Sequence, residues 1–95
     1  MIEIMRFRLV DGASEDDFAR ADKSLQEDFA YQQPGLLRRT TARADDGTWV
    51  VIDLWGSAAD ADACETRWEG DPVAQEFMRH VDRDSVTMEH YSELD

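Results

Sequence analysis

Cysteine, histidine and lysine are scarce in this 95-residue chain, and asparagine does not occur at all. The single cysteine, Cys64, excludes an internal disulfide and a cluster of thiolate metal ligands, and we expect it to behave as a small buried hydrophobe. The two histidines, His80 and His90, lack the spacing of a zinc site. The sequence therefore predicts no metal centre.

Long hydrophobic runs are also missing. Residues 1–10 lack the apolar stretch of a secretory signal, and no segment approaches the length of a membrane span. We therefore expect a cytoplasmic protein that does not insert into a membrane.

Positive charge is in short supply as well. Ten Lys and Arg residues face 22 Asp and Glu residues, which gives a formal net charge of −12, and Lys23 is the only lysine. Such a field repels phosphate backbones and anionic bilayers, which argues against nucleic-acid and membrane partners. The acidic residues are scattered over expected turns and helix faces, so they indicate a soluble acidic protein rather than a disordered one.

A chain of 95 residues has room for one core, so we expect a single domain over residues 1–95. A domain of this size buries only ~60–65% of the surface that its unfolded chain exposes. We therefore expect association with a second copy, or tight packing, to supplement the core.

The first half of the chain alternates between strand and helix patterns. Apolar residues at every second position predict a strand over residues 2–10. Ser14 is placed to cap a helix that runs to about Gln32, and Pro34-Gly35 ends it because proline cannot continue the helical ladder. The inward stripe of this helix is expected to consist of Phe18, Ala21, Leu25 and Phe29.

A hairpin is predicted next. Residues 36–44 are extended, Asp45-Asp46-Gly47 supplies a turn, and residues 48–55 form the returning strand. Both faces of the returning strand are largely apolar, with Asp53 as the exception. This strand is therefore expected to lie in the centre of a sheet that is covered on both sides.

The last part of the chain predicts a broken helix and a final strand. Ser57 is placed as the helix cap, and Gly70-Asp71-Pro72 breaks the helix. One face of the short continuation carries Val73, Phe77, His80 and Val81. Residues 85–94 alternate as a strand.

The resulting order is βαββαβ, which predicts an α+β, ferredoxin-like domain: a four-stranded antiparallel sheet with both helices on one face. The other face stays apolar around Ile2 and Ile4. An apolar sheet face without cover marks an interface, so we expect a homodimer through this open face.

At this point the chain resembles the dimeric α+β barrel superfamily, and within it the antibiotic-biosynthesis-monooxygenase-like proteins. The resemblance rests on the strand order, on Gln33-Pro34-Gly35-Leu36 before the hairpin, on a strand that ends at Trp55, and on the broken helix at Trp68–Val73. It implies a dimeric α+β barrel. The superfamily includes cofactor-free oxygenases of aromatic polyketides, heme-degrading enzymes, isomerases and dehydratases, so the fold does not select one activity.

Trp68 and His80 resemble two members of the residue set that heme-degrading relatives use. That set also needs an asparagine on the first strand, and this chain has none. His80 also lies about one helical turn later than the resemblance requires. The favoured interpretation is therefore that Trp68 fills the core and that His80 forms a hydrogen bond at the end of the helix.

A cofactor-free oxygenase needs a general base with a pKa near neutrality and an apolar pocket. His80 is the candidate catalytic base, and His90 is the alternative unless it lies at the dimer interface with Val86 and Met88. Arg6 or Arg39 could stabilise the resulting anion. The candidate ligand-binding residues are Tyr31, Arg39, Trp49, Asp53, Trp55, Trp68 and Phe77.

Asp53 has two interpretations, because a carboxylate on an apolar strand is costly unless it is paired. It is either a pocket acid with a raised pKa or one half of a buried ion pair. The ion pair is the favoured interpretation, and its candidate partners on neighbouring strands are Arg6, Arg8, Arg38 and Arg39.

Two hypotheses about function stay open. The favoured one is a small dimeric protein that binds an aromatic or polyketide-like ligand in a cleft between helices and sheet, without a cofactor. The alternative is a cofactor-independent monooxygenase or isomerase with His80 pointing into that cleft. If the protein is not an enzyme, Trp68 and Phe77 are expected to fill the space, with His80 bound to a carboxylate or a carbonyl.

Overall fold

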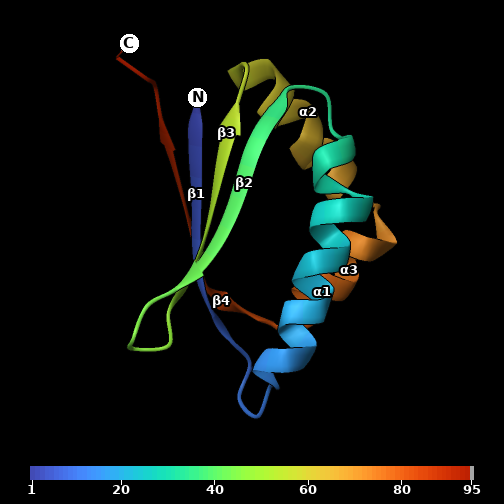
Figure 1. The fold of residues 1–95 in the computed structure, drawn as a ribbon, viewed down its shortest axis with the longest axis vertical. Helices are drawn as coiled ribbons and strands as arrows, with labels where there is room; N and C mark the ends of the chain where they lie inside the picture. Colours follow the sequence, from blue (N-terminus) through green and yellow to red (C-terminus); the bar gives the residue numbers. More distant parts are fainter. Residues whose placement is uncertain (95) are drawn as a thin grey trace.

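A four-stranded sheet forms one layer of the structure, and all the helices lie on one of its faces (Figure 1). The computed structural model describes residues 1–94. Every strand pair is antiparallel, and the strand order is β2-β3-β1-β4. The strands are β1 (Ile2–Leu9), β2 (Leu36–Arg43), β3 (Trp49–Trp55) and β4 (Val81–Tyr91). This arrangement confirms the predicted ferredoxin-like fold and the central position of β3.

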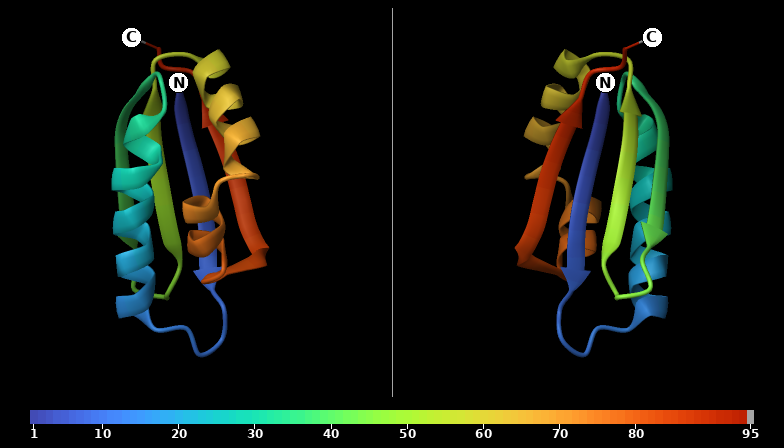
Figure 2. Two further views of the ribbon diagram at one scale, coloured as in Figure 1. Left: turned by 90° about the vertical axis from the view of Figure 1, so that its right-hand side faces the viewer. Right: turned by 90° about the vertical axis from the view of Figure 1, so that its left-hand side faces the viewer.

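The helical layer has two halves (Figure 2). Helix α1 (Glu15–Asp28) lies over β2 and β3 and continues into a 3₁₀ turn, η1 (Ala30–Gln32). On the other half, α2 (Ala58–Trp68) is followed by α3 (Pro72–Met78), which lies over β1 and β4. Within residues 1–94, none of these helices combines the length and the apolar character that a membrane span requires.

Side-chain caps fix where each helix begins. The backbone N–H of Asp17 donates to Ser14 Oγ at 3.2 Å, and that of Asp60 donates to Ser57 Oγ at 3.1 Å. At the start of α3, the N–H of Ala74 donates to the Asp71 carboxylate at 2.9 Å. The first N–H groups of a helix have no carbonyl of a preceding turn to bind, and these side-chain oxygens accept their hydrogen bonds instead. The predicted caps at Ser14 and Ser57 are thereby confirmed.

The prediction for residues 78–84 is wrong. Helix α3 ends at Met78, and β4 begins at Val81 rather than at residue 85. Val81 is 2% exposed and pairs with Leu9 on β1, so it belongs to the sheet and not to a helical face. Pairing with β1 outweighs a helical pattern that covers only one turn, since β propensity depends mainly on cross-strand packing.

Gly35 brings the lead-in to β2 against the beginning of α2. Its φ is +85°, and a Cβ atom there would lie 2.1 Å from the Asp60 carboxylate oxygen. Only glycine tolerates both the left-handed backbone and this close approach. The Pro34-Gly35 turn therefore closes one end of the space between helices and sheet.

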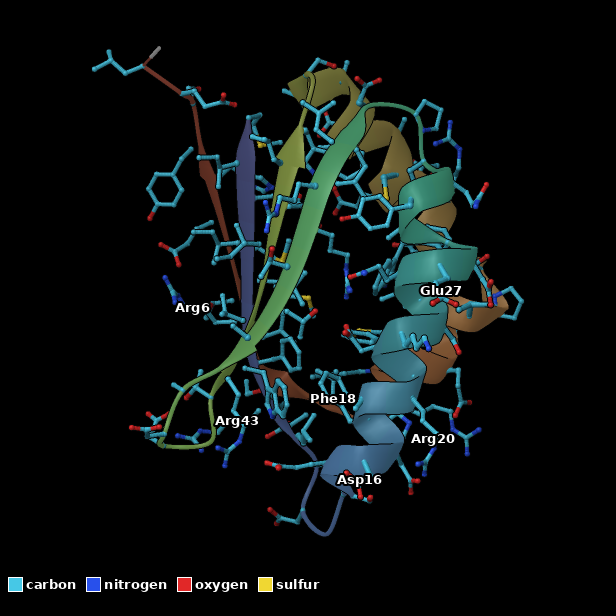
Figure 3. The ribbon with its side chains drawn as sticks, viewed as in Figure 1. Arg6, Asp16, Phe18, Arg20, Glu27 and Arg43 are labelled. Carbon is cyan, nitrogen blue, oxygen red and sulfur yellow. The ribbon has the colours of Figure 1, made fainter. Side chains whose placement is uncertain are left out.

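Aromatic rings fill the other end of that space. Phe18 on α1 packs against Phe7, Phe77 and Trp49, with ring centroids 4.8–5.8 Å apart. Figure 3 shows Phe18 between its helix and the sheet, whereas Arg20 lies on the outer side of the same helix. These rings belong to one buried core that also includes Leu25 and Phe29 at the far end of α1.

The face of the sheet away from the helices carries a central apolar strip. Its strand register places Ile4 beside Ile52, and Ile52 is 39% exposed. An ion pair of 2.9 Å between Arg6 and Glu89 lies on the same face (Figure 3 labels Arg6). The strip consists of Ile2, Ile4, Val50, Ile52 and Leu54.

Candidate functional site

A cavity of about 310 Å³ lies between the sheet and the helices. Most of its wall is apolar, and four aromatic side chains contribute to it: Phe29, Trp55, Trp68 and Phe77. The exposed residues of the lining are Glu65 on α2 and Met88 and His90 on β4. The cavity therefore opens between α2 and the edge strand β4.

A row of charged side chains crosses the floor of this cavity. Asp53 on β3 lies directly opposite Glu3 on β1 and Arg39 on β2, because these residues are partners in the strand register. All three line the cavity. The sheet thus presents two carboxylates and one guanidinium to a mostly apolar space.

Asp53 is the unusual member of the row. Its Oδ1 atom is buried and accepts no hydrogen bond from any residue between 1 and 94. Burial raises the pKa of Asp53 to about 7, against the opposing effect of the Arg39 charge, and the charges of Glu3 and Asp22 raise it further. The Asp53 carboxyl is therefore divided between its protonated and ionised forms at neutral pH.

Arg39 forms its side-chain hydrogen bonds with residues of α1 rather than with Asp53. Its guanidinium donates to Asp22 at 2.8 Å and to Gln26 at 3.4 Å, and its side chain is 3% exposed. The guanidinium also lies 5.8 Å from the centroid of the Phe77 ring. The ion pair that was the favoured interpretation of Asp53 is thus not formed with Arg39.

The other candidate partners of Asp53 also lie elsewhere. Arg6 pairs with Glu89, and Arg8 pairs with Asp46 in the hairpin turn. No salt bridge within the described part of the chain involves Asp53. The interpretation of Asp53 as a pocket acid with a raised pKa agrees with this geometry.

Glu3 is a site residue that the sequence analysis missed. One of its carboxylate oxygens accepts a hydrogen bond from Trp55 Nε1 at 3.3 Å, and the other lies 2.9 Å from His90 Nε2. The signal for Glu3 was the same as for Asp53, a carboxylate in a largely apolar strand. Its position between Ile2 and Ile4 hid this signal, because both neighbours point to the opposite face.

His90 lies at the mouth of the cavity, not on the open face of the sheet. It does share a strand face with Val86 and Met88, but that face lines the cavity. The suggestion that His90 lies at the dimer interface through the open face therefore does not agree with the structure.

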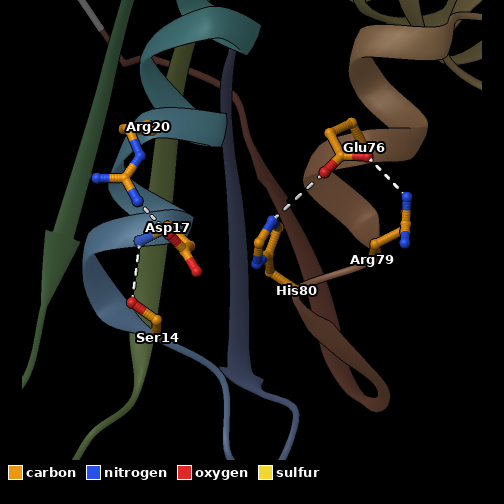
Figure 4. Close-up of polar contacts among 6 residues, drawn as sticks. All are labelled: Ser14, Asp17, Arg20, Glu76, Arg79 and His80. Carbon is orange, nitrogen blue, oxygen red and sulfur yellow. Dashed lines mark hydrogen bonds and ion pairs between the residues drawn. The ribbon is translucent and has the colours of Figure 1, made fainter.

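His80 lies outside the cavity, in a groove between α1 and α3 (Figure 4). Its Nε2 atom is 3.8 Å from the Glu76 carboxylate, and its ring approaches Phe18, which in turn packs on Phe77. Phe18 thus lies between His80 and the cavity wall. Because α3 ends at Met78, His80 does not follow the helical phase that would have aligned it with Phe77.

The remaining sequence-predicted site residues divide into two groups. Trp55, Trp68, Phe77, Arg39 and Asp53 line the cavity together. Trp49 instead packs on Phe18, and the Tyr31 hydroxyl accepts a hydrogen bond of 2.8 Å from the backbone N–H of Arg39. Tyr31 therefore supports the strand that carries Arg39 from outside the cavity.

Cys64 also lines the cavity. Burial raises the pKa of its thiol to about 11, and the nearby carboxylates of Asp53 and Glu3 act in the same direction. A thiol with this pKa stays protonated at neutral pH and is a poor nucleophile. Among residues 1–94, no three side chains of the metal-binding types lie close enough together to hold a metal ion.

Neither a protein-family model nor a curated protein matches the sequence. Solved structures do match it. SnoaB, a cofactor-independent oxygenase from Streptomyces nogalater, is 20% identical, and the alignment covers 98% of this chain and 94% of SnoaB with a TM-score of 0.69. A Nitrosomonas europaea protein assigned as an antibiotic biosynthesis monooxygenase is 12% identical over 99% of this chain and 98% of its own, with a TM-score of 0.65.

A dimeric ferredoxin-like protein from an uncultured marine organism is also similar. It is 14% identical, and the alignment covers 99% of this chain and 90% of that protein with a TM-score of 0.64. At these identities the similarity concerns the fold. The chain therefore shares the ferredoxin-like βαββαβ fold of the antibiotic-biosynthesis-monooxygenase-like proteins, and the predicted resemblance is confirmed at the level of that fold.

Proposed function

We propose that the protein binds a small aromatic ligand in the cavity between helices and sheet. The observation that carries this proposal is a cavity of about 310 Å³ with four aromatic side chains in its wall and with Asp53, whose buried Oδ1 atom accepts no hydrogen bond from residues 1–94. Pockets for small molecules are mostly apolar with a few polar groups that fix orientation. This volume lies at the lower end of their range of about 300–1,000 Å³, which suits a ligand of about two fused rings.

Two energetic costs coincide at this place. Protein cores are packed to near-crystalline density, so a cavity gives up the dispersion contacts that a filled core would make. A buried polar atom without a partner costs about 1–3 kcal/mol. A domain of this size has little stability to spare, so both costs at one position indicate a site retained for binding.

The binding proposal is tested by filling the cavity. We expect naphthalen-1-ylmethanol, an uncharged bicyclic probe, to bind the native protein in a calorimetric titration. Cys64→Phe places a ring in the cavity and should weaken binding by about tenfold or more, because the ligand and the new side chain compete for one volume. Thr66→Phe adds the same ring at an exposed position of α2 and should leave binding unchanged. Full affinity in Cys64→Phe would place the ligand elsewhere.

A second candidate function is cofactor-independent oxygenation, and Asp53 is the observation that favours it. A general base works best when its pKa lies near the working pH, and the pKa of Asp53 is about 7. The ionised carboxylate could take the proton of a bound phenol, and the resulting anion would lie on the same wall as Arg39. SnoaB, which shares the fold, is a cofactor-independent oxygenase. In this proposal the base is Asp53, whereas the sequence alone favoured His80.

Measurements of oxygen uptake distinguish Asp53 from His80 as the catalytic base. With naphthols and anthrones as substrates, Asp53→Asn should lower the rate of uptake by about 100-fold or more, since removal of a general base typically costs that much. His80→Ala should retain most of the rate, because His80 lies outside the cavity. The opposite pattern would restore the assignment of His80, and no uptake by the native protein would remove the oxygenase candidate.

The unfolding free energy should reveal the raised pKa of Asp53. The folded state holds the Asp53 proton up to about pH 7, whereas an unfolded chain releases it near its ordinary pKa of about 3.9. The contribution of this group to the free energy of unfolding therefore falls as the pH rises between those two values, and the decrease is complete above about pH 7.

Asp53→Asn removes this loss. The variant should be more stable than the native protein by on the order of 4 kcal/mol at about pH 8, and the difference should shrink toward zero near pH 4. Urea unfolding of both proteins across this range measures it, and all other groups cancel in the comparison. A constant difference at every pH would contradict the raised pKa.

We also propose that the protein is a homodimer through the open face of the sheet. The apolar strip on that face supports this, and so does the dimeric ferredoxin-like protein of similar fold. Light scattering at micromolar concentration should give twice the chain mass of 10.9 kDa.

Ile52→Lys places a charge in the centre of the strip and should yield monomers, because the charge would be buried without a partner. Val10→Lys, at a residue that is 40% exposed just after β1, is the control and should remain dimeric. A folded native protein that scatters as a monomer would contradict the proposal.

A further inference from the structure

We propose that the cavity selects aromatic ligands with a cationic head group, an arylalkylamine rather than an aryl carboxylate, and that Asp53 and Glu3 hold this group. The inference rests on the proposed binding function, because it names the chemical class of the ligand in the same cavity. Its basis is the balance of free acceptors and donors around the polar floor.

Acceptors outnumber donors at this floor. Asp53 and Glu3 lie side by side on β3 and β1, and both line the cavity. The Oδ1 atom of Asp53 has no hydrogen-bond partner in the described part of the chain, and a third carboxylate, Glu65 on α2, lies at the mouth. A ligand with donor groups can satisfy these oxygens, whereas a ligand with acceptors leaves them unpaired.

The positive groups near this floor are already engaged. Arg39 is bound by Asp22 and Gln26 from α1, so its charge is balanced outside the ligand space. His90 lies beside Glu3 at the exposed mouth, where its side chain is 54% exposed. No lysine is near, because the only one, Lys23, lies exposed on α1.

The groups that face Asp53 come from every neighbouring element. Arg39 on β2 favours its ionised form, while Glu3 on β1 and Asp22 on α1 disfavour it. From α2 the titratable groups that line the cavity are the Cys64 thiol, which stays neutral, and the Glu65 carboxylate at the mouth. An ammonium group placed here would be attracted by the two carboxylates, and a carboxylate would add a further like charge in a poorly solvated space.

The aromatic wall favours the same class of ligand. The rings of Trp68, Phe29 and Phe77 all line the cavity and pack edge to face, with centroids 5.7–6.0 Å apart, and the Phe77 ring already lies 5.8 Å from a cation, the guanidinium of Arg39. Aromatic faces attract cations at distances within about 6 Å, and tryptophan does so most strongly. The wall thus offers an apolar aromatic surface to the ring of an arylalkylamine, while the carboxylates of Asp53 and Glu3 on the floor face its head group.

Proton linkage gives this inference a signature that a structural role of Asp53 would not produce. A cation binds the ionised carboxylate, and the pKa of Asp53 in the free protein is about 7. The apparent affinity follows the ionised fraction, so it should rise about tenfold between about pH 6 and pH 8. A neutral ligand of the same shape should show a much smaller change.

Calorimetry with three probes of one skeleton tests the proposal: naphthalen-1-ylmethanamine, naphthalen-1-ylmethanol and naphthalene-1-carboxylate. We expect the amine to bind the native protein at least about tenfold more tightly than the alcohol near pH 8, and the carboxylate to bind more weakly than both. Asp53→Asn should remove most of the amine's advantage and leave the alcohol within about threefold. Asp45→Asn changes the net charge equally in the distant hairpin turn and should change neither affinity.

Each outcome has a defined meaning. If the alcohol binds but the amine has no advantage, or if the carboxylate binds best, the cationic preference is wrong while the proposed cavity function survives. If the amine's advantage persists in Asp53→Asn, Asp53 does not hold the head group and the inference fails. If none of the three probes binds, both the proposed function and this inference are overturned.

Discussion

The antiparallel register of β1, β3 and β2 is the constraint on which the rest of this structure depends. It forces Glu3, Asp53 and Arg39 into one row on the helix-facing side of the sheet. A charged side chain on the inner face of a sheet needs hydrogen-bond or ion-pair partners, because without them its burial costs folding free energy. Helix α1 supplies Asp22 and Gln26 for Arg39, and Trp55 and His90 contact Glu3. Asp53 receives no such partner among the described residues, and the cavity lies above it.

Much of the fold follows from local chemistry that a sequence displays. The sequence Asp45-Asp46-Gly47 predicted a turn because glycine readily adopts a positive φ, and Gly47 has a φ of +89°. The caps could be predicted because a serine hydroxyl accepts hydrogen bonds from the first backbone N–H groups of a helix, as Ser14 and Ser57 do. The central position of β3 followed from apolar residues on both of its faces. Asp53 was detected because it interrupts that pattern.

What could not be predicted depends on contacts between segments that are distant in the chain. Glu3 becomes part of the cavity only when β1 pairs with β3 and β4, which brings it beside Asp53 and His90. Asp53 had four candidate arginine partners, Arg39 among them, and only the position of α1 decides that Arg39 pairs with Asp22 instead. His80 was misplaced because the predicted helical face ran to Val81, whereas α3 ends at Met78, and this changes the direction of the His80 side chain relative to Phe77.

The position of the mouth has a consequence for the kinetics of ligand exchange. Met88 and His90 belong to an edge strand, and both are exposed beside Glu65. The mouth is thus bordered by surface side chains, and exposed side chains rotate within picoseconds to nanoseconds. For a ligand bound as proposed, the residence time would then be set by the strength of the ligand's own contacts rather than by a slow gate. Because the apolar strip lies on the opposite face of the sheet, joining two copies there leaves both openings free.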